Sequence, residues 1–178
     1  EFYKSLGLTV HFYSLSDANI ARAEQLATKT NQFNTTSRRY TAAQLLEMQR
    51  SGVGVYVIGT KDKFSALENT GLLIVKWNVP EQNCALVDSY LLSCRVLGRG
   101  VEMAGIRWLQ HKARARGIRR IVGEIVETER NQPVRNIFRD CDFQNGPAGQ
   151  WTYLQSERET ASPSWIRIQE HLSENEKA

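Results

Sequence analysis

A cysteine and two glycines, placed between an apolar run and an amphipathic helix, form the part of this sequence best suited to chemistry. The segment Cys94–Gly100 contains the pattern Arg-x-x-Gly-x-Gly. Glycines two residues apart leave backbone N–H groups open to an anion, and the N-terminus of a following helix adds unpaired donors and a positive dipole end. The pattern therefore predicts a phosphate-binding turn made of Arg95, Val96, Gly98, Arg99 and Gly100.

Cys94 is the candidate nucleophile. A thiolate is a good acyl acceptor, and Arg95 together with the nearby helix N-terminus is expected to favour the thiolate form. The alternative is a small buried side chain that closes the strand, as for most isolated cysteines. An extended chain from Cys94 to Gly98 spans at most about 13–14 Å. The thiol and the turn could therefore serve opposite ends of one long cofactor.

Three further residues are candidate general bases or orienting groups. Asp88 precedes Cys94 by an even number of residues, so both would share one face of a strand, although a bulge would reverse this and a structural role is equally open. Glu124 lies on the next predicted strand and is a general-base candidate. His111 falls on the predicted buried side of the helix near Trp108, where a packed role is favoured over a catalytic one.

A polar loop over residues 29–39 is rich in amides. Side-chain amides suit hydroxyl and carbonyl groups, and arginines suit a phosphate. Ordinary turn and capping chemistry is the alternative. The candidate substrate-binding residues of this loop are Asn31, Gln32, Asn34, Arg38 and Arg39. Asn131, which opens a later predicted helix, is a candidate cofactor-binding residue or a helix cap.

An α/β domain is needed to bring these residues together. The predicted elements are a strand over 7–15, helices over 16–28 and 41–51, strands over 53–59, 71–78 and 85–93, a helix over 100–117, a strand over 121–126, a helix over 131–141, and strands near 143 and 150–155. This order predicts a mixed, mostly antiparallel central sheet flanked by helices. We expect the domain to cover residues 1–155 and a C-terminal extension or linker to cover 156–178, in which Trp165, Ile166 and Ile168 suggest a short docked segment.

Composition narrows the classes of function. A chain of 178 residues that is 41% hydrophobic suits one core, and its net charge of +4 favours an acidic or phosphorylated partner. Three scattered cysteines predict neither a disulfide framework nor a metal site, and we expect a reducing, cytoplasmic compartment. No zinc-ligand spacing or basic, aromatic strand points to nucleic acid, and no apolar run of membrane-spanning length points to a membrane.

The strand, glycine-rich turn, helix and strand around Gly98 resemble the coenzyme A site of the GNAT acyltransferase superfamily, and the order of elements matches that fold. The resemblance implies a ligand that carries phosphopantetheine, either coenzyme A or an acyl carrier protein. It also implies that the strands over 85–93 and 121–126 separate near Cys94, because the cofactor arm must pair with exposed strand edges there.

Two longer segments, Arg22–Tyr40 and Leu91–Glu102, look like the C-terminal half of FkbH-like proteins. These polyketide-pathway enzymes load a glyceryl unit derived from 1,3-bisphosphoglycerate onto an acyl carrier protein. The resemblance implies that Cys94 carries the acyl group and that an acyl carrier protein is the partner. Family members also have an upstream phosphatase-like domain of the HAD superfamily. We expect that domain to be missing from this chain, because its one Asp-x-Asp, Asp140–Asp142, ends a helical stretch rather than a strand.

The sequence thus predicts an acyltransferase that moves a small glyceryl-type acyl group, by a thioester on Cys94, to the phosphopantetheine thiol of a carrier protein. One alternative is a conventional N-acetyltransferase that uses acetyl-CoA by direct attack. Another is a degenerate domain that only docks carrier proteins. Cys94 separates the three hypotheses, since only the first needs its thiol.

Overall fold

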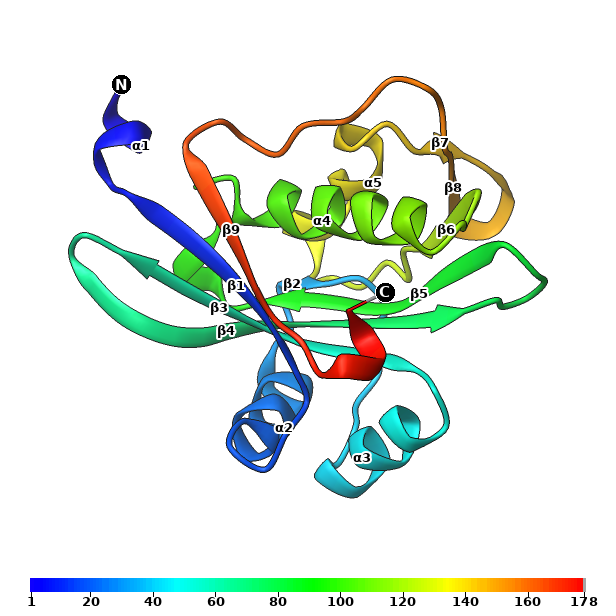
Figure 1. The fold of residues 1–178 in the computed structure, drawn as a ribbon, viewed down its shortest axis with the longest axis horizontal. Coiled ribbons are helices and arrows are strands. Elements are labelled where there is room, and N and C mark those ends of the chain that lie inside the picture. The colour runs from blue at the N-terminus through cyan, green and yellow to red at the C-terminus, as the bar shows by residue number, and fades with distance from the viewer. Residues whose placement is uncertain (178) are drawn as a thin grey trace.

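A mixed β-sheet forms the centre of the protein. A computed structural model describes residues 1–177. The strand order of the sheet is β7-β8-β6-β5-β4-β3-β1-β9, with β2 paired beside β5. Helices α2 and α3 cover one face of the sheet, and α4 and α5 cover the other (Figure 1). This is the α/β architecture that the sequence predicts.

The strands are β1 (Leu8–Ser14), β2 (Phe33–Asn34), β3 (Gly54–Asp62), β4 (Ser65–Trp77), β5 (Cys84–Leu92), β6 (Arg120–Glu124), β7 (Gln144–Asn145), β8 (Gln150–Leu154) and β9 (Ile166–His171). The α-helices are α1 (Phe2–Ser5), α2 (Ile20–Lys29), α3 (Ala42–Arg50), α4 (Val101–Ala115) and α5 (Ile137–Asp140). Short 3₁₀ turns are η1 (Cys94–Val96), η2 (Gln132–Val134), η3 (Pro147–Gly149) and η4 (Glu174–Glu176). In the described part of the chain, no helix has the length and apolar character needed to cross a membrane.

Strand β5 and helix α4 form the centre of the molecule. All but one residue of β5 are buried, as its apolar run predicts. Tyr90 of β5 is fully buried, and its hydroxyl donates to the carbonyl of Glu102 in α4 at 2.9 Å. Gly105 lets the two elements approach, because a Cβ there would lie 2.1 Å from the Tyr90 hydroxyl oxygen. The strand therefore fixes where α4, and the turn before it, must lie.

Strands β5 and β6 are parallel, and they pair only between residues 84–87 and 120–123. This confirms the predicted separation of the two strands before Cys94. The freed edge of β5 is nevertheless covered, because β2 pairs antiparallel with it and places Phe33 opposite Leu92. Asp88 is an extra residue in the register between β4 and β5, which makes it the centre of a β-bulge.

Two predicted elements differ in the structure. The helix expected over 131–141 is replaced by the shorter η2 and α5. The segment expected as an extension over 156–178 supplies β9, which pairs parallel with β1 from Leu8 opposite Ile166 to Tyr13 opposite His171. The boundary expected at residue 155 therefore does not separate two units, because the last strand belongs to the same sheet.

Candidate functional site

Cys94 lies two residues beyond the end of β5, at the start of η1, and it is exposed. It lines a cavity of about 390 Å³ between α2 and the end of β5, together with Arg22, Gln25, Leu26, Lys29, Thr30, Asn31, Gln32, Leu92, Ser93 and Arg95. The other two cysteines, Cys84 and Cys141, are buried. Burial raises the pKa of the Cys141 thiol to about 12. Cys94 is therefore the cysteine placed to react with a ligand.

Three cations give this cavity, which we call the Cys94 cavity, a positive character. Glu68 lies between two of them, 3.7 Å from Arg22 and 3.2 Å from Arg95. Among the described residues, Lys29 forms no such ion pair with a carboxylate. The three cations therefore outnumber the one carboxylate that pairs with two of them, and an anionic ligand is favoured. Arg95 is the neighbour of Cys94 in sequence, and its guanidinium pairs with the carboxylate of Glu68.

The predicted amide-rich loop divides into residues that line the cavity and residues that shape the loop. Asn31 and Gln32 share the cavity with Cys94. Arg39 does not line it: its guanidinium donates to the carbonyls of Ala27 and Thr30 and to the side chain of Asn31, and so holds the loop against α2. Two of the expected substrate-binding residues therefore meet the candidate nucleophile, and Arg39 supports one of them.

Asn34 and Arg38 have other roles. Asn34 is fully buried, its side-chain oxygen accepts from the backbone of Thr36 and Ser37, and its amide donates to Thr30. This is the turn chemistry given as the alternative for asparagine. Arg38 donates to the carbonyl of Asp88 at 2.8 Å, away from the Cys94 cavity.

Asp88 is the centre of a buried polar cluster. Its carboxylate, of which 3% is exposed, accepts from the Tyr40 hydroxyl at 2.7 Å and from Ser89 at 3.0 Å, and it lies 3.3 Å from the Lys76 ammonium. Burial and the hydrogen bond to Asp88 raise the pKa of Tyr40. A carboxylate surrounded by these donors has little capacity left to accept a substrate proton, so this environment favours the structural role for Asp88.

Glu124 and His111 lie apart from the Cys94 cavity. Arg38 joins Glu124 to the Asp88 cluster, with 3.2 Å between guanidinium and carboxylate. His111 is exposed rather than packed beside Trp108 as expected, and its ring contacts the carbonyl of Thr160. At about 1.5 Å per residue, its position in α4 is about 15 Å along the helix from Val101. Of the candidate bases, Glu124 alone is both partly exposed and close to the separation of β5 and β6.

The glycine turn has the predicted backbone shape, and the protein itself satisfies its polar groups. Gly98 and Gly100 have φ values of 78° and 92°, in the left-handed region that favours glycine. The N–H of Gly98 donates to the carboxylate of Glu102 at 3.0 Å. Val96 is buried in the core, and Arg99 pairs with Asp62 at 2.8 Å. A carboxylate therefore stands where the sequence predicts a phosphate.

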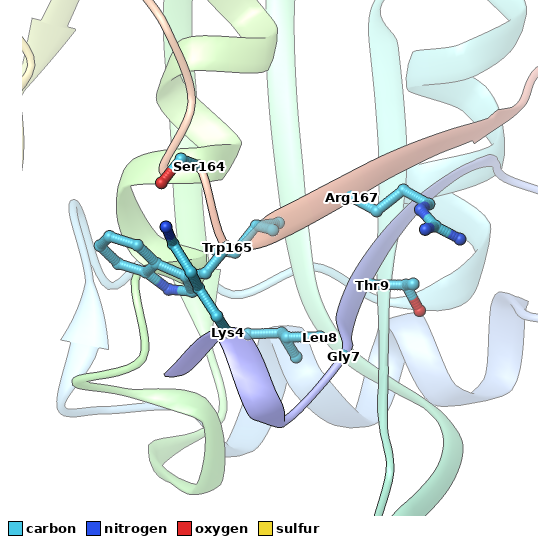
Figure 2. A pocket seen from close by; sticks show the side chains of 8 residues that line it. Lys4, Gly7, Leu8, Thr9, Ser164, Trp165 and Arg167 are labelled. Atoms are coloured by element: carbon cyan, nitrogen blue, oxygen red, sulfur yellow. The ribbon is translucent and has the colours of Figure 1, made fainter. Parts of the chain in front are cut away.

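Aromatic side chains from both ends of the chain cover this turn. Trp165 donates its indole N–H to the carbonyl of Arg99 at 2.8 Å, and the Tyr3 hydroxyl donates to the carbonyl of Gly98 at 3.2 Å. Trp165 also borders a cavity of about 440 Å³ at the start of β1 and β9, with Lys4 on one side and Arg167 on the other (Figure 2). None of the predicted site residues lines that cavity.

Asn131 is fully buried, and its side chain forms hydrogen bonds with backbone groups of the chain itself. Its amide donates to the carbonyls of Asn34 at 3.1 Å and Val126 at 2.8 Å, and its side-chain oxygen accepts from the N–H of Thr128. It therefore joins the loop that contains β2 to the chain that continues from β6. This contact leaves neither amide hydrogen of Asn131 for a cofactor arm.

The positions expected to hold a coenzyme A arm are occupied by the chain itself in the described conformation. The edge of β5 that should pair with pantetheine is paired with β2, and the turn that should hold phosphate is bonded to Glu102. Of the predicted site residues, Asn31, Gln32, Cys94 and Arg95 still line an open cavity. In the described residues no group of three or more histidine, cysteine, aspartate or glutamate side chains is arranged to hold a metal ion.

Comparison with known proteins supports the fold. No family model matches the chain. No curated protein matches it in sequence. Solved structures do match: the aminoglycoside acetyltransferase AAC(6')-Ib in complex with coenzyme A has 12% identity and a TM-score of 0.60, covering 82% of this chain and 95% of that one.

Two further solved structures agree. A protein from Desulfovibrio desulfuricans, described as a putative acetyltransferase of the GNAT family, has 14% identity and a TM-score of 0.65, with 82% and 98% of the two chains covered. Spermidine N-acetyltransferase from Vibrio cholerae, in complex with coenzyme A and spermine, has 12% identity and a TM-score of 0.60, with 82% and 95% covered. The chain therefore has the GNAT acetyltransferase fold.

Sequence reasoning missed Glu102 and the pairing of β2 with β5. The sequence shows Glu102 two residues after the second glycine of the turn, where its negative charge would oppose the binding of an anion. The pairing of Phe33 with Leu92 has no comparable signal, because a strand of two residues shows no periodicity.

Proposed function

We propose that this chain is an acyltransferase domain that holds a small, hydroxylated acyl group on Cys94 and passes it to the phosphopantetheine thiol of an acyl carrier protein. The observation that carries this proposal is the position of Cys94, an exposed thiol in a cavity with three side-chain amides and three cations. The resemblance to FkbH-like proteins makes a glyceryl unit the acyl group and an acyl phosphate derived from 1,3-bisphosphoglycerate the donor class.

The chemistry is two acyl exchanges on one sulfur. In the first, the Cys94 thiolate attacks the carbonyl carbon of the activated donor, the C–S bond forms, and the leaving group departs with its electron pair. In the second, the thiolate of the carrier attacks the thioester, and the bond to Cys94 breaks to restore its thiolate. Arg22, Lys29 and Arg95 would bind the anionic part of the donor, and Asn31 and Gln32 its hydroxyl groups.

A second candidate is N-acetyl transfer from acetyl-CoA by direct attack of an amine. The observation in its favour is the set of matching solved structures, which include complexes with coenzyme A and acetyl-CoA. In this reading Glu124 is the base to test, because it is partly exposed beside the separation of β5 and β6. The covered edge of β5 argues against it.

Intact-mass analysis after incubation with an acyl phosphate donor tests the first proposal. We expect one acyl adduct per chain, released by a small-molecule thiol, and no adduct in Cys94→Ala. Cys84→Ala is the matched control, because it removes a buried thiol and should keep the adduct. An adduct that persists in Cys94→Ala, or transfer by that variant at the original rate, would favour direct attack. Binding of a carrier protein with neither adduct nor transfer would favour a docking domain.

A further inference from the structure

The gap between β5 and the continuation of β6 contains four residues of the chain itself. After β2 pairs with β5, the N–H of Thr35 donates to the carbonyl of Tyr90 at 3.1 Å, and the N–H of Val126 donates to the carbonyl of Thr35 at 2.9 Å. Residues 33–36, which we call the insert, therefore bond to both sides of the gap. They occupy the position along β5 where an acyl-pantetheine arm was expected.

The residues of the insert are buried like those of a strand in the hydrophobic core. Phe33 is 2% exposed, and Asn34 and Thr35 are fully buried. The Phe33 ring meets the Tyr90 ring edge-on, with 5.4 Å between centroids. The Thr35 hydroxyl oxygen accepts from the N–H of Tyr90 at 3.0 Å, so a side chain completes the ladder. Moving the insert aside would expose these groups and leave buried polar atoms without partners.

Asp88 anchors the chain that follows the insert. The Thr36 hydroxyl and the Arg38 guanidinium both donate to the Asp88 carbonyl, at 3.1 and 2.8 Å, and the Tyr40 hydroxyl donates to its carboxylate. The β-bulge supplies this anchor, because the extra residue turns its carbonyl and carboxylate toward residues 36–40. None of these anchoring residues lines the Cys94 cavity.

We infer that residues 33–36 permanently take the place of a pantetheine arm beside β5, so that this chain binds no coenzyme A there. A thiol-bearing ligand instead reaches Cys94 through the Cys94 cavity. The insert closes the route along β5, and the Cys94 cavity offers the other route, lined by Arg22, Lys29 and Arg95. Those cations suit the phosphate of a phosphopantetheine group. The inference concerns the route to Cys94 and does not depend on whether Cys94 carries an acyl group.

Hydrogen–deuterium exchange of the whole chain, with and without millimolar coenzyme A, tests the closed edge. Amides of Thr35, Tyr90 and Val126 should exchange slowly and at the same rate in both samples. The double variant Thr36→Val, Asp88→Asn should speed exchange across the insert at least tenfold and leave β3 unchanged. Saturable acceleration at Thr35 by coenzyme A, or fast exchange of Thr35 in the free protein, would overturn the inference.

Charged methanethiosulfonate reagents test the route. The Cys94 thiolate attacks the reagent sulfur and expels methanesulfinate, leaving a mixed disulfide. A negatively charged reagent should react faster than a positively charged one, and Lys29→Glu should reduce that preference at least threefold. Lys63→Glu is the matched control, because Lys63 is exposed and lies outside the Cys94 cavity. A preference unchanged by Lys29→Glu would show that reagents reach Cys94 by another path.

Discussion

The carboxylate of Glu102 accepts a hydrogen bond from the backbone N–H of Gly98 at 3.0 Å, across the turn that precedes α4. Its second oxygen is buried and has no hydrogen-bond partner in the described part of the chain. The two residues form a closed unit in which a side chain supplies the negative charge that a helix N-terminus attracts. The glycine pattern therefore specifies the shape of an anion-binding turn, and Glu102 decides whether an anion can use it.

Replacing Glu102 with glutamine should strengthen the binding of inorganic pyrophosphate to this turn. Glutamine keeps an acceptor for Gly98 and removes the charge, which at a helix N-terminus is worth about 0.3–1 kcal/mol, or roughly a twofold to fivefold change in affinity. Isothermal titration of the variant and the parent measures the difference. Glu129→Gln removes an exposed charge elsewhere and should change nothing. Equal affinity in all three proteins would show that Glu102 does not shield the turn.

Thr35→Val should destabilise the fold by about 1–3 kcal/mol, because it removes the acceptor for the buried N–H of Tyr90 and keeps the side-chain shape. Urea unfolding followed by circular dichroism measures the change in free energy of unfolding. The same exchange at the exposed Thr28 is the control and should stay within about 0.5 kcal/mol of the parent. A Thr35→Val protein as stable as this control would mean that Tyr90 finds another acceptor.

The central elements were predictable because their signals are local. The apolar run before Cys94 and the three- and four-residue spacing from Val101 onward predict β5 and α4 directly. β2 and β9 were not predictable in this way: Phe33 pairs with Leu92, and Leu8 pairs with Ile166, across long stretches of chain. Such pairings depend on tertiary packing, which overrides local propensity.

The candidate site shows the same division. The residue types, together with the resemblance to FkbH-like proteins, suggested one site for Asn31, Gln32, Cys94 and Arg95, and these residues line one cavity. The residue types could not show that Asp88 would be enclosed by donors, because Tyr40 and Lys76 come from distant segments. They also could not show which asparagines face a ligand. That depends on the path of the loop, in which the Asn34 side chain stabilises a turn by accepting from the backbone N–H groups of Thr36 and Ser37.

Gly105→Ala should destabilise the protein by about 1–3 kcal/mol, although alanine is the better helix former by about 1 kcal/mol. The new Cβ would lie 2.1 Å from the Tyr90 hydroxyl oxygen, and β5 and α4 would have to separate. Adding Tyr90→Phe to this variant should recover part of the loss, because it removes the nearest atom. Thermal unfolding of the two single variants and the double variant measures this coupling. Strictly additive effects would place the strain elsewhere.

His11 should make the stability of the fold depend on pH below neutrality. Burial first, and then the charges of His171 and Lys61, lower its pKa in the folded state. Its ring lies 3.0 Å from His171 on β9 and 3.1 Å from the hydroxyl of Thr9. The unfolded chain therefore binds a proton more readily than the folded protein, so stability is complete above about pH 6.5 and falls as the pH decreases from there.

Unfolding free energies measured from pH 8 to pH 5 test this sign. The parent should lose stability across that range. His11→Gln should lose less, because glutamine does not take up a proton at the position where β1 pairs with β9. His111→Gln is the matched control: His111 is exposed on α4, so removing it should leave the parent's pH dependence in place. If His11→Gln and the parent fall with the same slope, the acid sensitivity arises outside the β1–β9 pair. If the parent gains stability toward pH 5, the folded protein binds the additional proton and the assigned direction is reversed.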